Sequence, residues 1–235
     1  GILANTDTNT NSSPFADAPT SWEDVENVTI VFHGAGGQDS YTDELMQNLK
    51  KSYQNAYNKS FETIIDWSGL SSNLLQASFN GQRYGRFVAA QLMKETKQFK
   101  KLKTVHFIGI SVGAFAADAA VTELKEELGS NDEGVFVQLT LLDPFAQRGV
   151  IGPNYGDRNF GRSADYAQQF LNTDDPVPST NAALSNCACT DVTELRPPSI
   201  FGHDWPLVYF SRSGRFGIVP EADRRPAGSV LKLSQ

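Results

Sequence analysis

The sequence predicts an α/β fold in a single domain, with a mostly parallel central sheet and helices on both of its faces. Apolar β-type runs alternate along the chain with segments of helical periodicity, which is the order of a strand-helix-strand architecture. The β-type runs are continuously apolar, as is typical of parallel strands buried on both faces. With 235 residues, 40% of them hydrophobic, the chain can bury one substantial core without dividing into two.

The expected elements begin shortly after Trp22. Strands are predicted where β-branched and aromatic residues cluster, and helices where apolar residues recur at helical spacing. The last predicted helix is also rich in alanine, the strongest helix former. In chain order we expect a strand over Val28 to His33, a helix over Asp43 to Asn55, a strand over Phe61 to Trp67, a helix over Leu74 to Lys100, a strand over Thr104 to Ile110, a helix over Val112 to Leu128, and strands over Val135 to Leu142 and Tyr166 to Leu171.

A flexible polar tail is expected over residues 1–21, followed by the domain over residues 22–235. The tail is rich in Asn, Thr, Ser, Asp and Pro without periodicity, so we expect it to bury too little apolar surface to become ordered. Glycosylation sequons at Asn11, Asn27 and Asn58 favour an extracellular protein, and the 235 residues contain no signal peptide, which either was removed or never existed.

Charge and cysteine content restrict the expected partners and cofactors. A net charge of −7 and a pI near 5.0 argue against nucleic acid, because its binding requires clustered cations. The basic run from Lys97 to Lys103 is interpreted as the solvated end of a helix. Cys187 and Cys189 are one residue apart and supply half a zinc site at most. We therefore expect reduced thiols or a labile pair, and neither a metal nor a cofactor.

The most informative motif is Gly-x-Ser-x-Gly around Ser111, between the strand that ends at Ile110 and an alanine-rich helix. In a turn that sharp, side chains two residues before and after the serine would collide with the neighbouring strand and helix. Gly109 and Gly113 meet that need. The turn would raise the Ser111 hydroxyl above the carboxyl edge of the sheet, so Ser111 is a candidate nucleophile.

A serine nucleophile requires a base, and the chain holds three histidines. His203 follows the last strand region and comes last in the order serine, acid, histidine, so it is the predicted base. His106 lies inside a strand, where a buried structural imidazole is expected. His33 ends the first strand and is followed by Gly34-Ala35-Gly36-Gly37.

Two backbone N–H groups are predicted to form an oxyanion hole. Glycines allow the backbone to approach a negatively charged oxygen without interference from side chains. The glycine-rich segment after His33 therefore suggests the N–H of Ala35, and the start of the helix after Ser111 suggests the N–H of Val112.

Several short motifs together resemble the pancreatic-type lipase family of α/β hydrolases, which includes phospholipases A1. The resemblance extends from Val28 to Phe210 and rests on Ile30-Val31-Phe32-His33-Gly34, Asp66-Trp67, Gln76-Ala77-Ser78-Phe79-Asn80, Gly85, Val105 to Ala114, Leu142-Asp143-Pro144, Asn172-Thr173-Asp174 and His203. It implies an α/β-hydrolase fold and hydrolysis of a lipid or other carboxylic ester, with transient contact to a lipid surface. It implies the following roles: nucleophile Ser111, general base and acid His203, orienting carboxylate Asp143, and oxyanion donors Ala35 and Val112.

The chain also departs from that family. Ile110 and Val112 flank the serine where family members usually carry His and Leu, and only Val192 to Gly202 separate Asp191 from His203. The long disulfide-closed lid of the family has no counterpart there, so a lidless relative that accepts dispersed esters is expected. An acyltransferase using the same residues remains an alternative, as does a non-catalytic lipid-binding relative, which would be expected to have lost a functional residue.

Two aspartates compete for the role of the acid. Asp143 follows the strand that ends at Leu142, in the pancreatic-type sequence Leu-Asp-Pro. Asp175 follows the next strand in an Asp-x-Val-Pro context that resembles the carboxylate turn of fungal lipases and of α/β hydrolases generally. His203 carries one Nδ1 proton, so we expect one aspartate to accept it and the other to cap a helix or turn. The wider resemblance favours Asp143.

Overall fold

The computed structural model describes residues 13–15, 17–56, 59–96, 101–129, 134–149 and 152–234. Within these residues, seven strands form one sheet in the order β2-β1-β3-β4-β5-β6-β7, and every neighbouring pair is parallel. The α/β class predicted from the sequence is therefore confirmed. The strands are β1 (Asn27–Phe32), β2 (Ser60–Ile65), β3 (Thr104–Ile110), β4 (Phe136–Leu142), β5 (Tyr166–Leu171), β6 (Ala188–Asp191) and β7 (Val230–Lys232).

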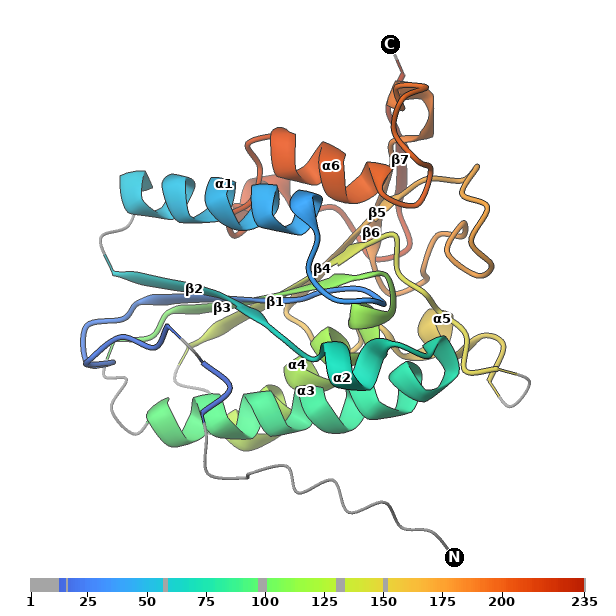
Figure 1. Cartoon of the computed structure of the whole chain (residues 1–235). Coiled ribbons are helices and arrows are strands. Elements are labelled where there is room, and N and C mark those ends of the chain that lie inside the picture. Colours follow the sequence, from blue (N-terminus) through green and yellow to red (C-terminus); the bar gives the residue numbers. More distant parts are fainter. Residues whose placement is uncertain are drawn as a thin grey trace, which may run out of the picture.

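Helices cover both faces of this sheet (Figure 1). Helices α1 and α6 lie on one face, and α2, α3 and α4 lie on the other. None of the helices in the described part of the chain is long and apolar enough to cross a membrane. The helices are α1 (Ser40–Ala56), α2 (Ser68–Ser71), α3 (Leu74–Thr96), α4 (Ala114–Leu128), α5 (Tyr155–Asn159) and α6 (Trp205–Arg212), and a 3-10 turn, η1 (Ser111–Gly113), precedes α4.

The core is divided by the sheet into two apolar layers. Because successive side chains of a strand point to opposite faces, each strand contributes to both layers. All six residues of β1 are buried, as are all six of β5. Ile30 and Phe107 pack in the layer under α3 and α4, whereas Val31 and Ile108 pack against Leu45 of α1 in the other layer. The continuously apolar strands of the sequence thus reflect burial on both sides.

Several boundaries differ from the sequence prediction. Helix α1 begins three residues earlier, at Ser40, because the Asp39 side chain caps it by accepting hydrogen bonds from the N–H (2.8 Å) and the hydroxyl (2.7 Å) of Thr42. Strands β6 and β7 and helices α2, α5 and α6 had not been predicted. The sequons at Asn11 and Asn58 and the run of residues 97–100 lie outside the described residues.

The remaining sequon, at Asn27, is unsuited to glycosylation. Asn27 belongs to β1 and is buried, and its side-chain oxygen accepts a hydrogen bond of 2.7 Å from the hydroxyl of Thr104. A glycan requires an exposed asparagine side chain, so burial at this position leaves no room for one.

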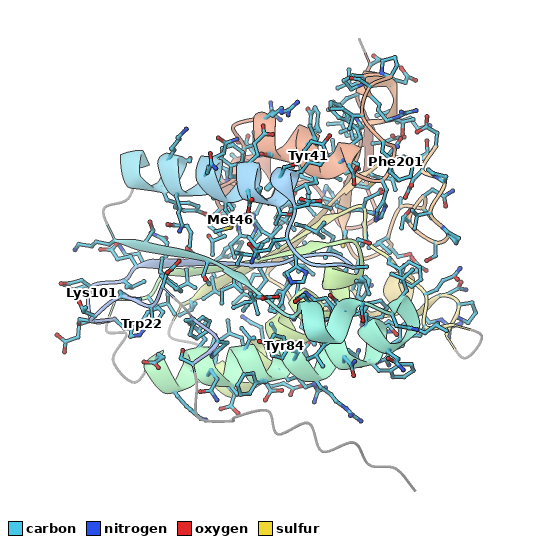
Figure 2. All side chains as sticks on the ribbon, viewed as in Figure 1. Trp22, Tyr41, Met46, Tyr84, Lys101 and Phe201 are labelled. Carbon is cyan, nitrogen blue, oxygen red and sulfur yellow. The ribbon has the colours of Figure 1, made fainter. Side chains whose placement is uncertain are left out.

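The packed part of the chain begins before the predicted domain start at Trp22. Phe15 is buried, and its ring makes edge-on contacts with Trp22 (centroids 6.0 Å apart) and Phe61 (6.1 Å). Figure 2 labels Trp22 near the ends of the strands opposite the carboxyl edge. The predicted polar tail over residues 1–21 thus includes an aromatic anchor, because one large apolar ring is enough to dock a polar segment on the core.

Helices α3 and α4 meet without space for a side chain at Gly85. A Cβ atom placed there would overlap the main-chain carbonyl of Ala116 on α4. We therefore predict that Gly85→Ala lowers the free energy of unfolding by about 2–4 kcal/mol, because either helix must move to admit the methyl group. The exposed Gly69 of α2 has nothing within 4 Å of such a Cβ, so Gly69→Ala is the matched control and should be near neutral. Equal denaturation midpoints for the two variants would contradict this account of the helix contact.

Candidate active site

The sequence-predicted site residues gather at the carboxyl edge of the sheet, because neighbouring parallel strands end there together. Ile110 pairs with Leu142, and Leu142 pairs with Phe170, so the segments that follow β3, β4 and β5 leave the sheet side by side. Ser111 follows β3 directly and Asp143 follows β4 directly. This is the edge at which open parallel sheets bind ligands.

The turn at Ser111 has the strained geometry predicted from its glycines. Ser111 has a φ of 51°, in the left-handed region that residues with a Cβ rarely adopt. A Cβ on Gly109 would lie 2.7 Å from Cα of Ala114, and one on Gly113 would overlap the carbonyl oxygen of Phe32. Glycine is therefore required at both positions by close backbone approach, which keeps the serine at the start of α4.

His203 connects Ser111 to two carboxylates. Its Nε2 lies 2.8 Å from Ser111 Oγ, while its Nδ1 lies 2.9 Å from Asp143 Oδ2 and 2.8 Å from Asp175 Oδ2. Ser111, Asp143 and Asp175 are all buried, whereas 18% of the His203 side chain is exposed. The serine can donate its hydroxyl proton to Nε2 only if Nδ1 carries the ring proton, which the two carboxylates favour.

Both candidate acids lie within hydrogen-bonding distance of His203 Nδ1, although the ring nitrogen carries only one proton for them to accept. Asp175 does form the expected turn, since its Oδ1 accepts the N–H of Val177 at 3.0 Å, and its Oδ2 also accepts the hydroxyl of Thr180. Asp143 Oδ1 accepts the N–H of Asn172 at 3.2 Å. The carboxylates lie on neighbouring segments, so both reach the same ring nitrogen.

The two carboxyl groups differ in their acidity. Burial raises the pKa of Asp143 to about 8, with Asp175 adding to this rise and His203 opposing it. Burial alone would also raise the pKa of Asp175, but hydrogen bonds from Asp143, Thr180 and the N–H of Val177 bring it below its ordinary value. For His203, burial alone would lower the pKa, but the hydrogen bond and charge of Asp143, followed by those of Asp175, raise it.

Asn172, which the sequence singled out only as part of a motif, bonds to residues on both sides of the site. Besides its main-chain bond to Asp143, its side-chain amide donates to the carbonyl of Gly202 at 2.8 Å. It therefore ties the segment after β5 to the residue that precedes His203. Hydrogen bonds to distant segments leave no periodic or charge pattern in the sequence, so the sequence alone did not distinguish Asn172.

His33 orders the segment that contains Ala35. Trp67 donates its main-chain N–H to His33 Nε2 (3.1 Å), so the ring proton is on Nδ1, which donates to the carbonyl of Gly34 at 2.8 Å. That bond fixes the plane of the peptide between Gly34 and Ala35, whose N–H points the opposite way from the carbonyl. A Cβ on Gly34 would lie 3.3 Å from Ser111 Cβ, so this peptide lies against the serine.

The second predicted oxyanion donor, Val112, is fully buried at the start of η1. The first N–H groups of a helix lack partners within the helix, so the Val112 N–H beside Ser111 is a candidate donor. Together with the Ala35 segment, the arrangement is suited to binding a negatively charged oxygen.

Asp143, Asp175 and His203 bring together three side chains of the kinds that ligate metals. One oxygen from each aspartate and a ring nitrogen of His203 lie within 4.8 Å of one another. The N···O separations of 2.8 and 2.9 Å are those of hydrogen bonds. Two ligands at about 2.1 Å from one tetrahedral ion would lie about 3.4 Å apart, so the cluster has the geometry of a hydrogen-bonded group.

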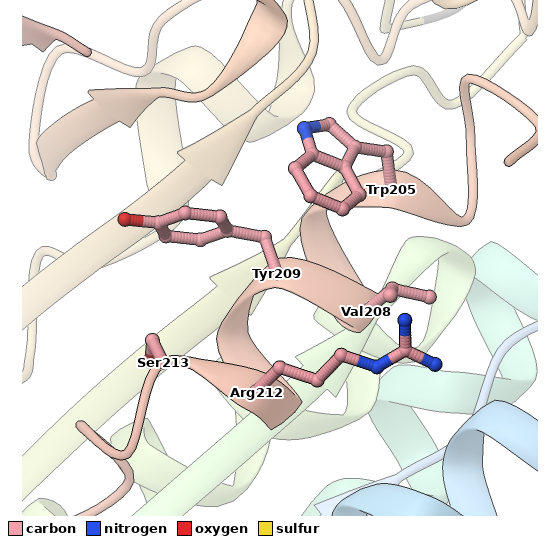
Figure 3. A pocket seen from close by; sticks show the side chains of 5 residues that line it. All are labelled: Trp205, Val208, Tyr209, Arg212 and Ser213. Carbon is pink, nitrogen blue, oxygen red and sulfur yellow. The ribbon is translucent and has the colours of Figure 1, made fainter. Parts of the chain in front are cut away.

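A small pocket of about 150 Å³ lies on one side of α6 (Figure 3). The residues that line it recur at helical spacing along α6 and its end, and none of them is a predicted site residue. The guanidinium of Arg212 on its rim is held by Glu44 of α1 at 2.7 and 2.9 Å. The lining residues are Trp205, Val208, Tyr209, Arg212 and Ser213.

The two cysteines near β6 are both free and buried, as the sequence predicted for reduced thiols. Burial raises the pKa of Cys189 to about 12 and also raises that of Cys187. Buried thiols of this kind are poor nucleophiles and poor metal ligands, because the thiolate is the reactive form.

His106 has the structural position expected of it. It is fully buried in β3, with Nε2 2.7 Å from Thr140 Oγ1 and 3.2 Å from Gln138 Nε2. The Gln138 side chain in turn bonds the main chain at Gly217 (3.3 Å) and Val219 (2.8 Å). This network joins the central strands to the segment after α6.

We predict that His106 makes the protein acid-sensitive. Burial lowers its pKa to about 3, so between pH 6.5 and 3 the unfolded chain binds a proton that the folded chain does not. Stability should therefore fall as the pH is lowered through this range, by up to about 1.4 kcal/mol per pH unit from this residue. Urea titrations at several pH values should show that the free energy of unfolding depends less steeply on pH in His106→Gln than in the wild type. Parallel curves for the two proteins would show that His106 does not titrate as its burial requires.

No family model matches the chain, and no curated protein matches it either. A function must therefore be inferred from the site itself. The relevant observations are the strained serine, the histidine bonded to it and the two buried carboxylates behind that histidine.

Proposed function

We propose that the protein is a serine carboxylic-ester hydrolase of the α/β-hydrolase type. The observation that carries the proposal is the continuous hydrogen-bonded chain from Ser111 Oγ through both ring nitrogens of His203 to buried carboxylates. A buried serine bonded to a histidine, which an acid orients in turn, is the arrangement that activates a hydroxyl for nucleophilic attack. The left-handed turn at Ser111 supports the same reading, because strained backbone is concentrated at functional sites.

In the first half of the reaction, Ser111 Oγ attacks the ester carbonyl carbon while its proton passes to His203 Nε2. The C–O bond to the leaving alcohol then breaks, and His203 returns the proton to the alcohol oxygen. In the second half, a water molecule loses a proton to Nε2 and attacks the acyl-enzyme, and the carboxylic acid is released as Ser111 regains its proton. A carboxylate at Nδ1 stabilises the imidazolium that forms in each half.

The carbonyl oxygen becomes negatively charged in each tetrahedral intermediate. We assign its stabilisation to the N–H groups of Ala35 and Val112, as the sequence predicted. The hydrogen bond from His33 to Gly34 supports this assignment, since it orients the peptide that carries the Ala35 N–H before substrate binds. Such preorganised donors commonly contribute on the order of 10²–10³ in kcat.

Exposed apolar side chains support an apolar ester as substrate. Leu75 and Phe79 are exposed on the first turns of α3, which Figure 1 places at the end of the sheet where the strand arrows point. Phe201, two residues before His203, is 56% exposed and is labelled in Figure 2 at the same end of the molecule. An acyl chain or a lipid surface would cover such groups.

The resemblance to pancreatic-type lipases and phospholipases A1 agrees with this proposal. The residues that carry it include Ser111, Asp143 and His203, which lie within one hydrogen-bonded cluster. The substrate class we propose is a lipid or a small carboxylic ester. The chemistry written above uses side chains and main-chain N–H groups alone, and thus calls for no cofactor.

The first test is labelling with a fluorophosphonate, in which Ser111 Oγ would bond to phosphorus as fluoride leaves. We predict stoichiometric labelling of the wild type and none of Ser111→Ala. The variant should keep the wild-type unfolding midpoint within a few degrees, because it loses only one hydroxyl. Labelling of both proteins at the same residue would remove Ser111 from its proposed role, and a wild type that neither labels nor hydrolyses esters would refute the proposed function.

The second test is the pH dependence of hydrolysis. His203 must be neutral to accept a proton, so kcat/KM should rise with pH through its ionisation. Because the two aspartates raise the pKa of His203, the midpoint should lie above the ordinary value of 6.5. A midpoint well below 6.5, with the substrate stable throughout, would be inconsistent with a histidine that two carboxyl groups stabilise.

A further inference from the structure

We infer that Asp143 and Asp175 act as one carboxyl pair that holds a single proton beside His203. In this pair Asp175 is the ionised member that accepts the Nδ1–H, and Asp143 is a protonated positioning residue that donates to Asp175. Either aspartate can then serve as the acid when the other is lost. The inference deepens the proposed function, on which its kinetic part rests.

The Nδ1–H of His203 is one donor that faces two carboxyl acceptors. Nδ1 carries a single proton, yet Asp175 Oδ2 lies 2.8 Å away and Asp143 Oδ2 lies 2.9 Å away. A conventional Ser-His-Asp arrangement needs one carboxylate at this position. The second carboxyl group therefore requires its own physical explanation.

Burial makes double ionisation of the pair unfavourable. The side chains of Asp143 and Asp175 are 2% and 0% exposed, and the salt-bridge contact of each is with His203, which is neutral while it acts as a base. Two buried carboxylates that share a site cannot both be charged at little cost, so one takes up a proton.

Two further acidic groups, Asp204 and Asp39, lie near the pair. Asp204, at the start of α6, interacts with His203, Asp39 and Asp175, and its own pKa is raised mainly by burial. Asp39 lies in the exposed loop before α1. These groups add negative potential and thereby favour the protonated form of one member of the pair.

The hydrogen bonds identify the member that keeps the proton. Asp175 accepts from the Val177 N–H and the Thr180 hydroxyl as well as from His203, and donors of this kind stabilise a carboxylate. Asp143 accepts from one main-chain N–H, that of Asn172. The raised pKa of Asp143 and the lowered pKa of Asp175 agree with this division.

This arrangement predicts partial redundancy between the acids. In Asp143→Asn, the amide can donate to Asp175 as the carboxylic acid did, so the ionised acid keeps its place. In Asp175→Asn, Asp143 loses the neighbour that helps to raise its pKa, ionises, and accepts the Nδ1 proton itself. Only the double variant leaves His203 without a carboxylate.

The kinetic test compares these three variants in one ester assay. We expect kcat to fall by less than about 10-fold in Asp143→Asn, by about 10- to 100-fold in Asp175→Asn, and on the order of 10⁴-fold in the double variant. A loss on the order of 10⁴ in either single variant would overturn the shared role and leave that aspartate as the sole acid. If the wild type lacks Ser111-dependent activity, the proposed function fails, and the pair is tested by the next measurement alone.

The second measurement requires no activity. Because the folded-state pKa of Asp143 is raised to about 8, the folded chain holds a proton that the unfolded chain releases near pH 4. The contribution of Asp143 to stability should therefore fall as the pH rises from about 4 to 8, and Asp143→Asn should lack that fall. Asp118, buried on α4 with a pKa raised to about 7, titrates in both proteins, so it cancels in their difference.

The deciding quantity is the difference in free energy of unfolding between the wild type and Asp143→Asn, measured as a function of pH. Asp118→Asn serves as the matched control. Asp118→Asn should remove its own step and leave the one due to Asp143. A difference that is flat or that rises between pH 4 and 8 would mean that Asp143 is ionised throughout, and the inference would be wrong.

Discussion

The left-handed turn at Ser111 constrains the rest of the structure. A residue with a Cβ held at a φ of 51° costs on the order of 1–3 kcal/mol, so the surrounding structure must enforce it. Close main-chain contacts on both sides of the serine do so. A Cβ on Gly109 would lie 2.7 Å from Cα of Ala114 in α4, and a Cβ on Gly113 would overlap the carbonyl oxygen of Phe32 at the end of β1. The Ser111 carbonyl also accepts the N–H of Phe145 at 3.1 Å, which couples this turn to the segment after β4. Asp143, with a φ of 46°, makes a second left-handed turn at the start of that segment. The strain at the candidate nucleophile and at one candidate acid is thus supported by a single connected piece of structure.

The histidine is held in a different way, by hydrogen bonds between loops. Asn172 binds the carbonyl of Gly202, and the indole N–H of Trp205 donates to the carbonyl of Val192 at 2.8 Å. These donors are buried, so an unmade bond would carry the full cost of desolvation. The loop that carries His203 is consequently positioned against the carboxyl edge by polar groups, whereas Ser111 is positioned by backbone packing. The two halves of the site therefore depend on different kinds of interaction.

Sequence analysis succeeded where a feature is local. The strands up to β5 and the helix α4 follow from apolar runs and helical spacing, and the turn at Ser111 follows from two glycines at fixed offsets. Strands β6 and β7 have four and three residues, too few for a periodic signal, and they are defined by pairing with distant partners. Helix α6 has eight residues and starts with Trp-Pro, so its short apolar run could not be separated from a loop. The burial of Phe15 was not predicted, because a single apolar residue does not change the polar composition of the segment around it.

The acid illustrates how topology adds to sequence. Asp143 and Asp175 both follow a predicted strand and both precede a proline, so local context could not choose between them. Strands β4 and β5 are neighbours, with Leu142 paired to Phe170, and residues that follow neighbouring parallel strands meet at one edge. Because the two aspartates lie side by side, His203, which belongs to a third segment, contacts both carboxyl groups at once. The charge of each is then set by the other and by the donors around it, so neither aspartate's role can be read from its own sequence position.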